Sequence, residues 1–283
     1  MATSTCFQAA QIAISLALWP ALTLRANRLR ATREDVQRQL ASEGVETEPA
    51  HVAPDGLTVT AGNPLRRPAD GLFVVQDEAS QLVAMAVGAR PGDRVLDLCA
   101  APGGKTTAIA AALADRGVIV ASDVRPRRLQ LLREAVRVSG ASHAHVVQVP
   151  ARGPLPFGTT FDRVLVDAPC SGLGTIRRDP DIRWRREEAS LATLASAQLE
   201  LLTRASDTVA PGGRLVYATC SSEPDENEQV ADLFLDRHDD FAVEAIVEPV
   251  LAPFTDSRGM FRTLPFEHGL EAFFAVVLVR RPA

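Results

Sequence analysis

The chain has 283 residues, of which 46% are hydrophobic and 23% are charged. This length suits one large domain with an appendage or two unequal domains, and the composition excludes a largely disordered chain. The formal net charge of −5 excludes a protein that holds nucleic acid through an overall basic field. Any contact with nucleic acid must therefore be local.

The basic residues are almost all arginine: 29 of the 30 are arginine, and the only lysine is Lys105. Three groups of arginines lie close together in the sequence: Arg25, Arg28, Arg30 and Arg33; Arg125, Arg127, Arg128, Arg133 and Arg137; and Arg177, Arg178, Arg183, Arg185 and Arg186. Each group is a candidate for phosphate contacts, and a solvated helix face is the alternative interpretation of each.

The four cysteines, Cys6, Cys99, Cys170 and Cys220, form no CxxC pair and have no histidine at metal-ligand spacing nearby. We therefore expect no metal site. The chain is far larger than the small secreted domains that depend on disulfides, so free thiols in a reducing compartment suit the pattern better. The expected location is the cytoplasm.

Ile12 to Leu24 is an apolar stretch that Pro20 interrupts. It is too short to cross a membrane, and no basic residue precedes it as a signal peptide would require. We expect a helix there that is buried or faces a partner, and we expect no association with a membrane.

The elements expected near the start of the chain are short and mixed. Residues 22–24 favour a strand, Thr32 with Asp35 marks the start of a helix over residues 33–42, and residues 57–60 favour another strand. Proline and glycine become frequent from Pro49 onwards, which predicts a boundary near Gly71. We expect a small α+β module over residues 1–70 and a second domain over residues 71–283.

After Gly71 the predicted strands and helices alternate, as in a parallel sheet covered on both faces. The expected helices span residues 77–87, 106–113, 126–138, 187–209 and 226–237. The expected strands span residues 94–98, 118–121, 145–149, 163–166, 214–218, 241–246 and 272–280. The predicted fold class is α/β, with a doubly wound, Rossmann-like sheet.

The turn after the first strand of this domain predicts a nucleotide-type ligand. Its residues are Cys99, Ala100, Ala101, Pro102, Gly103, Gly104 and Lys105. Small residues there let a ligand approach the backbone amides at a helix start. The turn matches neither GxGxxG nor the phosphate-binding GxxxxGK[ST] motif, and S-adenosylmethionine has no phosphates to bind. Asp123, at the end of the second strand, is placed to bind ribose hydroxyls.

Two cysteines follow neighbouring strands: Cys170 comes after the fourth strand and Cys220 after the fifth. A lone cysteine favours a buried inert thiol, but two at one edge of a sheet favour chemistry. Cytosine C5 is a weak carbon nucleophile, and a thiolate that adds at C6 activates it for methylation. This route needs a nucleophile, an acid or base, and a carboxyl group near N3. Cys220, Cys170 and Asp167 can supply these groups.

Three sequence blocks carry a resemblance to a known family: VLDLCAAPGGKTT, FDRVLVDAPCSGLGTIRRDPDIRW and GGRLVYATCSSEPDENEQV. They resemble the signature blocks of the Sun/Fmu-type RNA (cytosine-5-)-methyltransferases, with similar flanking segments. The resemblance implies that Cys220 attacks C6 and that Cys170 assists product release. It also implies that the turn from Cys99 to Lys105, together with Asp123 and Asp167, holds S-adenosylmethionine.

Lys105 is a further candidate for the catalytic site. In a chain that uses arginine at every other basic position, a single lysine in this turn indicates that a compact ammonium group is required. The loop of residues 171–184 adds Arg177, Arg178, Arg183 and Trp184, which are candidates for phosphate contacts and base stacking. The alternative is a solvated loop with Trp184 packed on the sheet.

The sequence departs from the family pattern in two places. Pro150 follows the third strand, where the family usually has an aspartate near the adenine. Proline cannot accept that hydrogen bond, and the loss weakens cofactor binding by about 1 to 2 kcal/mol. The helical domain that bacterial ribosomal members commonly carry at the N-terminus is expected to be absent, or reduced to the first twenty or so residues.

The leading interpretation is a monomeric enzyme that makes 5-methylcytosine in 16S ribosomal RNA, with transfer RNA as the next substrate. Residues 1–70 would bind RNA, and residues 71–283 would form the catalytic domain. One alternative is a DNA cytosine methyltransferase, in which the thiol of the PC block, Cys170, attacks the base. The other alternative is a non-catalytic RNA-binding assembly factor, which Pro150 and the short N-terminus would suit.

Overall fold

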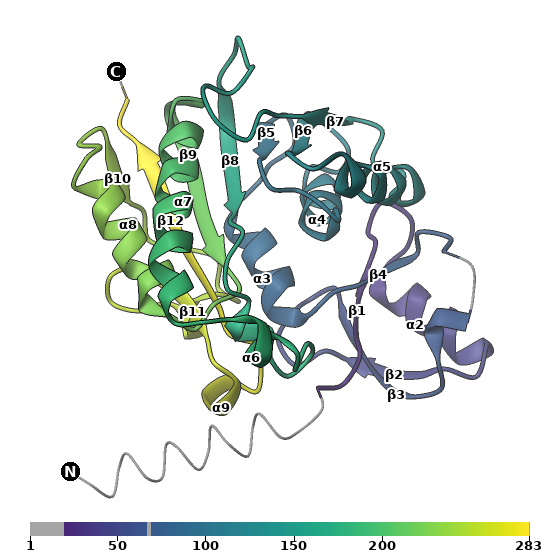
Figure 1. Cartoon of the computed structure of the whole chain (residues 1–283). Coiled ribbons are helices and arrows are strands. Elements are labelled where there is room, and N and C mark those ends of the chain that lie inside the picture. Colours follow the sequence, from purple (N-terminus) through teal and green to yellow (C-terminus); the bar gives the residue numbers. More distant parts are fainter. Residues whose placement is uncertain (1–19, 67–68, 283) are drawn as a thin grey trace, which may run out of the picture.

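The structure is a computed structural model that describes residues 20–66 and 69–282. Two β-sheets organise these residues (Figure 1). A four-stranded sheet near the start of the chain lies beside an eight-stranded sheet that carries helices on both faces. Within the described residues, no helix is long and apolar enough to cross a membrane.

The small sheet has the order β2-β3-β1-β4, and its neighbouring strands are antiparallel. Its strands are β1 (Thr23–Ala26), β2 (Glu46–Pro49), β3 (Gly56–Ala61) and β4 (Phe73–Val75). Helix α2 (Arg33–Ser42) packs on this sheet through Val36 and Leu40. The Thr32 side chain accepts from the N–H of Asp35, and the Asp35 carboxylate accepts from the N–H of Thr32. This reciprocal cap confirms the predicted helix start.

The large sheet has the order β10-β12-β9-β8-β5-β6-β7, and β11 pairs with β12. Its strands are β5 (Arg94–Asp97), β6 (Val118–Asp123), β7 (Ala144–Gln148), β8 (Phe161–Asp167), β9 (Val209–Thr219), β10 (Phe241–Val243), β11 (Met260–Thr263) and β12 (Phe273–Arg280). Strands β5 to β9 are parallel, whereas the pairs that β12 makes are antiparallel. The strand order reverses between β5 and β8, which is where doubly wound sheets bind ligands. The predicted α/β, doubly wound, Rossmann-like fold is confirmed.

Helices cover the large sheet on both faces. The helices of this region are α3 (Glu78–Ala86), α4 (Gly104–Ala112), α5 (Pro126–Ser139), α6 (Ile182–Arg185), α7 (Ala189–Ser206), α8 (Glu228–Leu235) and α9 (Pro265–His268). The short helices α6 and α9 bury no residue. Single 3-10 turns lie at Pro64–Arg66, Leu173–Thr175, Pro224–Glu226 and Ala252–Phe254. α3, α4 and α5 bury Leu82, Ile109 and Leu132 against one face, and α7 and α8 bury Leu202 and Phe234 against the other (Figure 1). Burying one such side chain is worth about 1.5–3 kcal/mol, so the two clusters fix the strands whose ends form the site.

Several predicted elements differ from the structure at their ends. The helix predicted over residues 187–209 is wrong beyond Ser206, and Val209 instead begins β9. A register shift between β8 and β9 accommodates the Pro-Gly-Gly segment as a bulge, so β9 is longer than the predicted residues 214–218. The predicted helix over residues 226–237 begins only at Glu228, because Pro224–Glu226 forms a 3-10 turn.

The start of the chain is described only in part. Residues 12–19 of the predicted apolar helix, and Cys6, lie outside the described residues. The strand predicted over residues 22–24 is confirmed for Thr23 and Leu24, which lie in β1 and pair with Thr58 and Leu57 of β3. The helix prediction is therefore wrong for these two residues. The domain boundary near Gly71 stays a prediction. The strand just after it, β4, pairs with β1 in the small sheet.

Candidate active site

The loop between β5 and α4 lines a cavity of about 250 Å³ at the carboxyl edge of the parallel strands. Gly103 has a φ of 114°, a left-handed conformation that glycine adopts without strain, and α4 begins directly after it. A Cβ added at Gly103 would lie 2.9 Å from the Cβ of Ala135 on α5. The turn therefore depends on glycine both for its conformation and for its packing.

The cavity brings together most of the residues predicted to hold the cofactor. Its lining includes Cys99, Ala100, Ala101, Pro102, Gly104, Lys105 and Asp167. Gly103 and Asp123 are not part of the lining. Asp123 is 4% exposed; one of its carboxylate oxygens accepts from the N–H of Arg125 at 2.9 Å, and the other lies 3.4 Å from Arg128 Nη1. The Asp123 carboxylate thus faces the start of α5.

The lining also includes residues that sequence reasoning missed. These are Val75, Gln76, Asp77 and Ser80, together with Asp97 at the end of β5. The first four run from the last residue of β4, Val75, to the first turn of α3, which contains Ser80 and which Asp77 caps. A helix cap of this kind is visible in sequence, but its position beside the cavity depends on how the two sheets meet.

Asp97 is fully buried beside the cavity. Thr106 Oγ1 donates to its Oδ2 at 2.7 Å, while Oδ1 has no hydrogen-bond partner within the described part of the chain. Burial raises the pKa of Asp97 to about 7. A buried oxygen without a partner suits a ligand that brings hydrogen-bond donors.

Lys105 and Asp167 form an ion pair at the edge of the same cavity. Lys105 Nζ donates to Asp167 Oδ2 at 2.7 Å, and the ring of Phe273 lies 5.4 Å from Nζ. Burial by itself would lower the pKa of Lys105, but the charge of Asp167 and the hydrogen bond outweigh it, so the pKa is raised. Lys105 is therefore a cation at neutral pH.

The structure places the two predicted thiols in contact. Cys170 Sγ and Cys220 Sγ lie 3.2 Å apart, although 50 residues separate them in the sequence. The loops that carry them are joined by the N–H of Gly174, which donates to the carbonyl of Cys220 at 3.0 Å. A Cβ at Gly174 would lie 2.8 Å from the carbonyl oxygen of Cys220 and 2.0 Å from that of Ala272, so only glycine permits this approach.

The two thiols differ in acidity. The hydrogen bond to Cys220, followed by burial, raises the pKa of Cys170. The hydrogen bond from Cys170 lowers the pKa of Cys220 in spite of its burial, and the charge of Lys105 also lowers it. Cys220 is therefore the more acidic thiol of the pair, and Cys170 is the better suited to donate the hydrogen bond. Burial raises the pKa of Cys99, whose thiol stays protonated.

The four candidates in the loop after Cys170 divide into two kinds. Arg177 Nε donates to Glu271 at 3.1 Å, and Arg178 Nη2 donates to Asp77 at 2.9 Å, so both hold the loop against other parts of the chain. Arg183 and Trp184 remain exposed on α6, Trp184 with 81% of its surface free. The alternative in which Trp184 packs on the sheet is wrong.

Among the described residues, no group of three or more His, Cys, Asp or Glu residues is arranged to hold a metal ion.

This chain matches models of known protein families. A family model described as 16S rRNA methyltransferase RsmB/F matches residues 84–279. The chain belongs to this family. A second model, described as the ferredoxin-like domain of RsmF/B-like methyltransferases, matches residues 7–66.

Individual relatives agree with the family match. The chain is 36% identical to the probable ribosomal RNA small subunit methyltransferase B of Bacillus subtilis (strain 168) and 37% identical to that of Synechocystis sp., over 263 residues in each case. Both alignments cover 90% of this chain and 59% of the relative, so the chain spans about three fifths of their length. The crystal structure of PH0851 is similar, with 33% identity and a TM-score of 0.87 over 95% of this chain and 61% of that chain.

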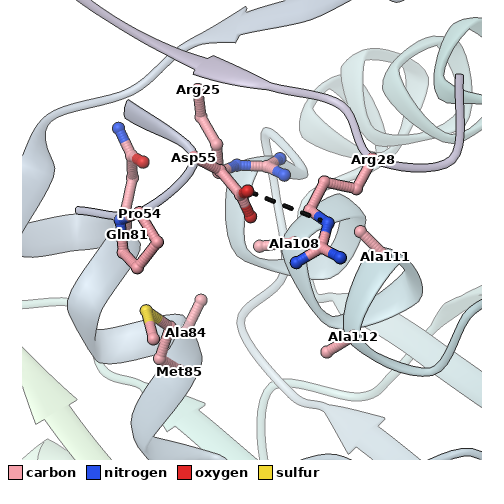
Figure 2. A pocket seen from close by; sticks show the side chains of 10 residues that line it. All are labelled: Arg25, Arg28, Pro54, Asp55, Gln81, Ala84, Met85, Ala108, Ala111 and Ala112. Carbon is pink, nitrogen blue, oxygen red and sulfur yellow. Dashed lines mark ion pairs between the residues drawn. The ribbon is translucent and has the colours of Figure 1, made fainter. Parts of the chain in front are cut away.

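In this RsmB/F family member, Arg25 of β1 joins the ferredoxin-like region to the methyltransferase region. Its side chain is buried, and it donates to Gln76 Oε1 at 2.6 Å and to Thr107 Oγ1 on α4 at 2.7 Å. Burial lowers the pKa of Arg25 to about 10. Figure 2 shows a second cavity, of about 200 Å³, between Arg25, Arg28 and the alanine-rich face of α4. It shares no lining residue with the cavity beside Lys105.

Proposed function

We propose that this chain is an S-adenosylmethionine-dependent RNA methyltransferase that converts cytosine to 5-methylcytosine, with Cys220 as the covalent nucleophile. The observation that carries the proposal is the contact of 3.2 Å between the two thiols. A cytosine C5 methyltransferase needs a thiolate for C6 and a second group that can exchange protons beside it. The lowered pKa of Cys220 and the raised pKa of Cys170 suit these two roles.

The cavity beside Lys105 is the proposed cofactor site. Glycine and alanine in the turn leave room for a ligand at the start of α4, and the unpartnered Oδ1 of Asp97 would accept from its amino or hydroxyl groups. S-adenosylmethionine bound there supplies an electrophilic methyl group. The turn from Cys99 to Lys105, with Asp123 and Asp167, would hold it, and Asp123 would do so by releasing Arg128.

The thiolate of Cys220 begins the reaction. Its sulfur forms a bond to C6 of the cytosine, and the electron pair of the C5–C6 double bond makes C5 nucleophilic toward the methyl group. The Asp167 carboxyl group is assigned to N3, where it would share a proton with the nitrogen as negative charge develops there. Lys105 holds that carboxyl group in place through the 2.7 Å bond. The target base must leave its stack to reach these groups.

Product release reverses the thiol addition. The hydrogen on C5 leaves as a proton that solvent water accepts, and its electron pair re-forms the C5–C6 double bond. The C6–sulfur bond then breaks, and its electron pair returns the Cys220 thiolate. Cys170 assists this step, because a thiol 3.2 Å away donates a hydrogen bond to the departing sulfur. Loss of Cys170 is therefore expected to trap the covalent adduct.

The proposed substrate is small-subunit ribosomal RNA, supported by the family match and by the names of the relatives in Bacillus subtilis and Synechocystis. Residues 1–70 are proposed as an RNA-binding module and residues 71–283 as the catalytic domain. Arg183 and Trp184, exposed on α6 close after Cys170 in the chain, are proposed to contact RNA beside the target base.

Two experiments test the proposal. Bisulfite sequencing of total RNA with and without this protein should show one protected cytosine in 16S ribosomal RNA. A protected position in transfer RNA would move the substrate to that class, and none in any RNA would contradict the activity. In the second experiment, RNA carrying 5-fluorocytosine should form a covalent adduct with the wild type and with Cys170→Ser but not with Cys220→Ser. The reverse pattern would assign the attack to Cys170, as in DNA cytosine methyltransferases.

A further inference from the structure

A buried carboxylate lies directly behind the two thiols. Glu226 ends the 3-10 turn that follows Cys220, and none of its surface is exposed. Its Oε1 accepts from the N–H of Ser171 at 2.8 Å and from Gln198 Nε2 at 2.9 Å. Its Oε2 accepts from the hydroxyl of Ser221 at 2.6 Å. Moving a carboxylate from water into a buried site costs free energy, and the three donors that bind Glu226 here carry no opposite charge to offset it. This cost indicates that Glu226 has a role beyond stabilising the fold.

The partners of Glu226 are the residues next to the thiols. Ser171 directly follows Cys170, and Ser221 directly follows Cys220. The two serine hydroxyls lie 3.2 Å apart, the same separation as the two sulfurs. One carboxylate therefore binds the residue immediately after each thiol.

Glu226 is itself held from two further elements. The hydroxyl of Tyr217 on β9 donates to the backbone carbonyl of Glu226. Gln198 of α7, which donates to the Glu226 carboxylate, also donates to the carbonyl of Pro169 at 3.0 Å, on the other side of Cys170. The carboxylate is therefore fixed relative to both loops and to the helix beneath them.

Charge distinguishes the surroundings of the two sulfurs. The hydrogen bond to Cys220 and burial are the largest causes of the raised pKa of Cys170, and the charges of Cys220 and Glu226 add to it. Cys220 instead faces the ion pair of Lys105 and Asp167. Within the described residues, Glu226 has no ion-pair partner. The cation next to this loop is Arg186, which donates to the backbone carbonyls of Ser171 at 2.8 Å and Cys170 at 3.4 Å and not to the Glu226 carboxylate.

We propose that Glu226 is a positioning residue for the reaction, which holds the two thiols at contact distance and keeps the hydrogen of the pair on Cys170. The proposal rests on the proposed function only for naming Cys220 as the nucleophile. Its test uses the free protein without RNA, so its outcome is separate from that of the methylation assays.

Two substitutions separate geometry from charge. Glu226→Gln preserves the contacts, because the amide oxygen accepts from Ser171 and Gln198 while the amide nitrogen donates to Ser221, but it removes the charge. Glu226→Asp keeps the charge and withdraws the carboxylate by one methylene. Glu78→Gln is the control for the loss of a buried carboxylate elsewhere, since Glu78 is also buried and accepts from the backbone N–H groups of residues 51–53 in another part of the fold. Its amide nitrogen cannot accept a hydrogen bond, so this control perturbs the local contacts more than Glu226→Gln does.

The first measurement is the site of alkylation. Substoichiometric iodoacetamide near neutral pH should label mainly Cys220 in the wild type and in Glu78→Gln, as peptide mass spectrometry reports. In Glu226→Gln the share on Cys170 should rise, by about tenfold for each unit by which loss of the charge lowers the pKa of Cys170. An unchanged ratio in folded Glu226→Gln would overturn the role assigned to its charge.

The second measurement is the rate at which diamide joins Cys170 to Cys220 as a disulfide. Glu226→Asp should slow this reaction by about tenfold or more, because a displacement near 1 Å suffices for such a loss, while Glu226→Gln should stay close to the wild type. Ser221→Ala removes only one of the three hydrogen bonds to the Glu226 carboxylate, and it replaces Glu226→Asp in the test if that variant does not fold. It should also slow disulfide formation. A wild-type rate in either folded variant would overturn the positioning role.

Discussion

Lys105 Nζ lies 2.7 Å from Asp167 Oδ2, so the single lysine of the chain neutralises the carboxylate at the end of β8. The lysine side chain is 11% exposed, which leaves little room for the wider guanidinium group of an arginine. This gives a physical reason for a lysine at a position where the rest of the chain would use arginine. The ion pair also lies close enough to Cys220 to affect its acidity.

Lys105→Met should make Cys220 less reactive. The substitution removes a cation that lowers the pKa of Cys220 and leaves Asp167, whose charge raises it. We expect alkylation of Cys220 near neutral pH to slow by about tenfold for each unit of increase in its pKa. Arg163→Met is the control, because Arg163 pairs with Asp93 at the opposite end of β8. Equal rates in wild type and Lys105→Met would contradict the prediction.

Arg25 should contribute more to stability than its neighbour Arg28. Arg25 is buried and donates to the side chains of Gln76, which follows β4, and Thr107 on α4. Arg28 is 65% exposed, and its ion-pair contact with Asp55 is long at 3.8 Å. Arg25→Met should lower the free energy of unfolding by about 2–4 kcal/mol, because Gln76 and Thr107 lose their partner in a buried site. Arg28→Met should cost about 0–1 kcal/mol. Urea unfolding of both variants measures the difference, and similar costs would show that the junction does not depend on Arg25.

Asp97 should make the protein less stable as the pH rises. Its pKa in the folded chain is raised to about 7, so the folded state holds a proton there that the unfolded state has lost. This contribution is complete below the unfolded pKa of about 4 and is lost between about pH 4 and pH 7. The substituted asparagine does not titrate, so the melting temperature of Asp97→Asn minus that of the wild type should increase from about pH 4 to pH 7. Above about pH 7 this difference should stay constant. Asp207→Asn, at an exposed position, is the control. A constant difference across the interval would show that Asp97 does not titrate there.

The sequence predicted the thiols and the glycine turn because the carboxyl ends of parallel strands converge at one edge of a sheet. Cys170, Cys220 and Lys105 each follow such a strand closely, so their meeting required no knowledge of loop structure. Glu226 was not found, because it belongs to a 3-10 turn whose importance comes from contacts with Ser171 and Gln198, each far away in the sequence.

Acidic partners far away in the sequence also explain why phosphate binding was the wrong interpretation for Arg177 and Arg178, in the loop after Cys170. Arg177 and Arg178 are basic residues next to a predicted active site, which in sequence suggests phosphate binding. Their acidic partners, Glu271 and Asp77, are 94 and 101 residues away. Arg183 and Trp184 have the same local sequence environment and remain exposed. Only the packing of the loop distinguishes the two pairs.

Pro150→Asp should strengthen the binding of S-adenosylmethionine. Pro150 follows β7 and is exposed, and its carbonyl accepts from Arg204 at 2.8 Å, as does that of Ala151 at 3.0 Å. Because Arg204 binds the backbone and not the proline ring, the loop should keep its course when the side chain changes. A carboxylate there restores the acceptor that the family pattern has, so we expect Kd to fall by about 5- to 30-fold. Isothermal titration calorimetry measures it, with Pro154→Asp in the same exposed loop as the control. If both variants bind the cofactor as the wild type does, the acceptor at this position contributes nothing, and the affinity of this chain depends on the turn from Cys99 to Lys105 instead.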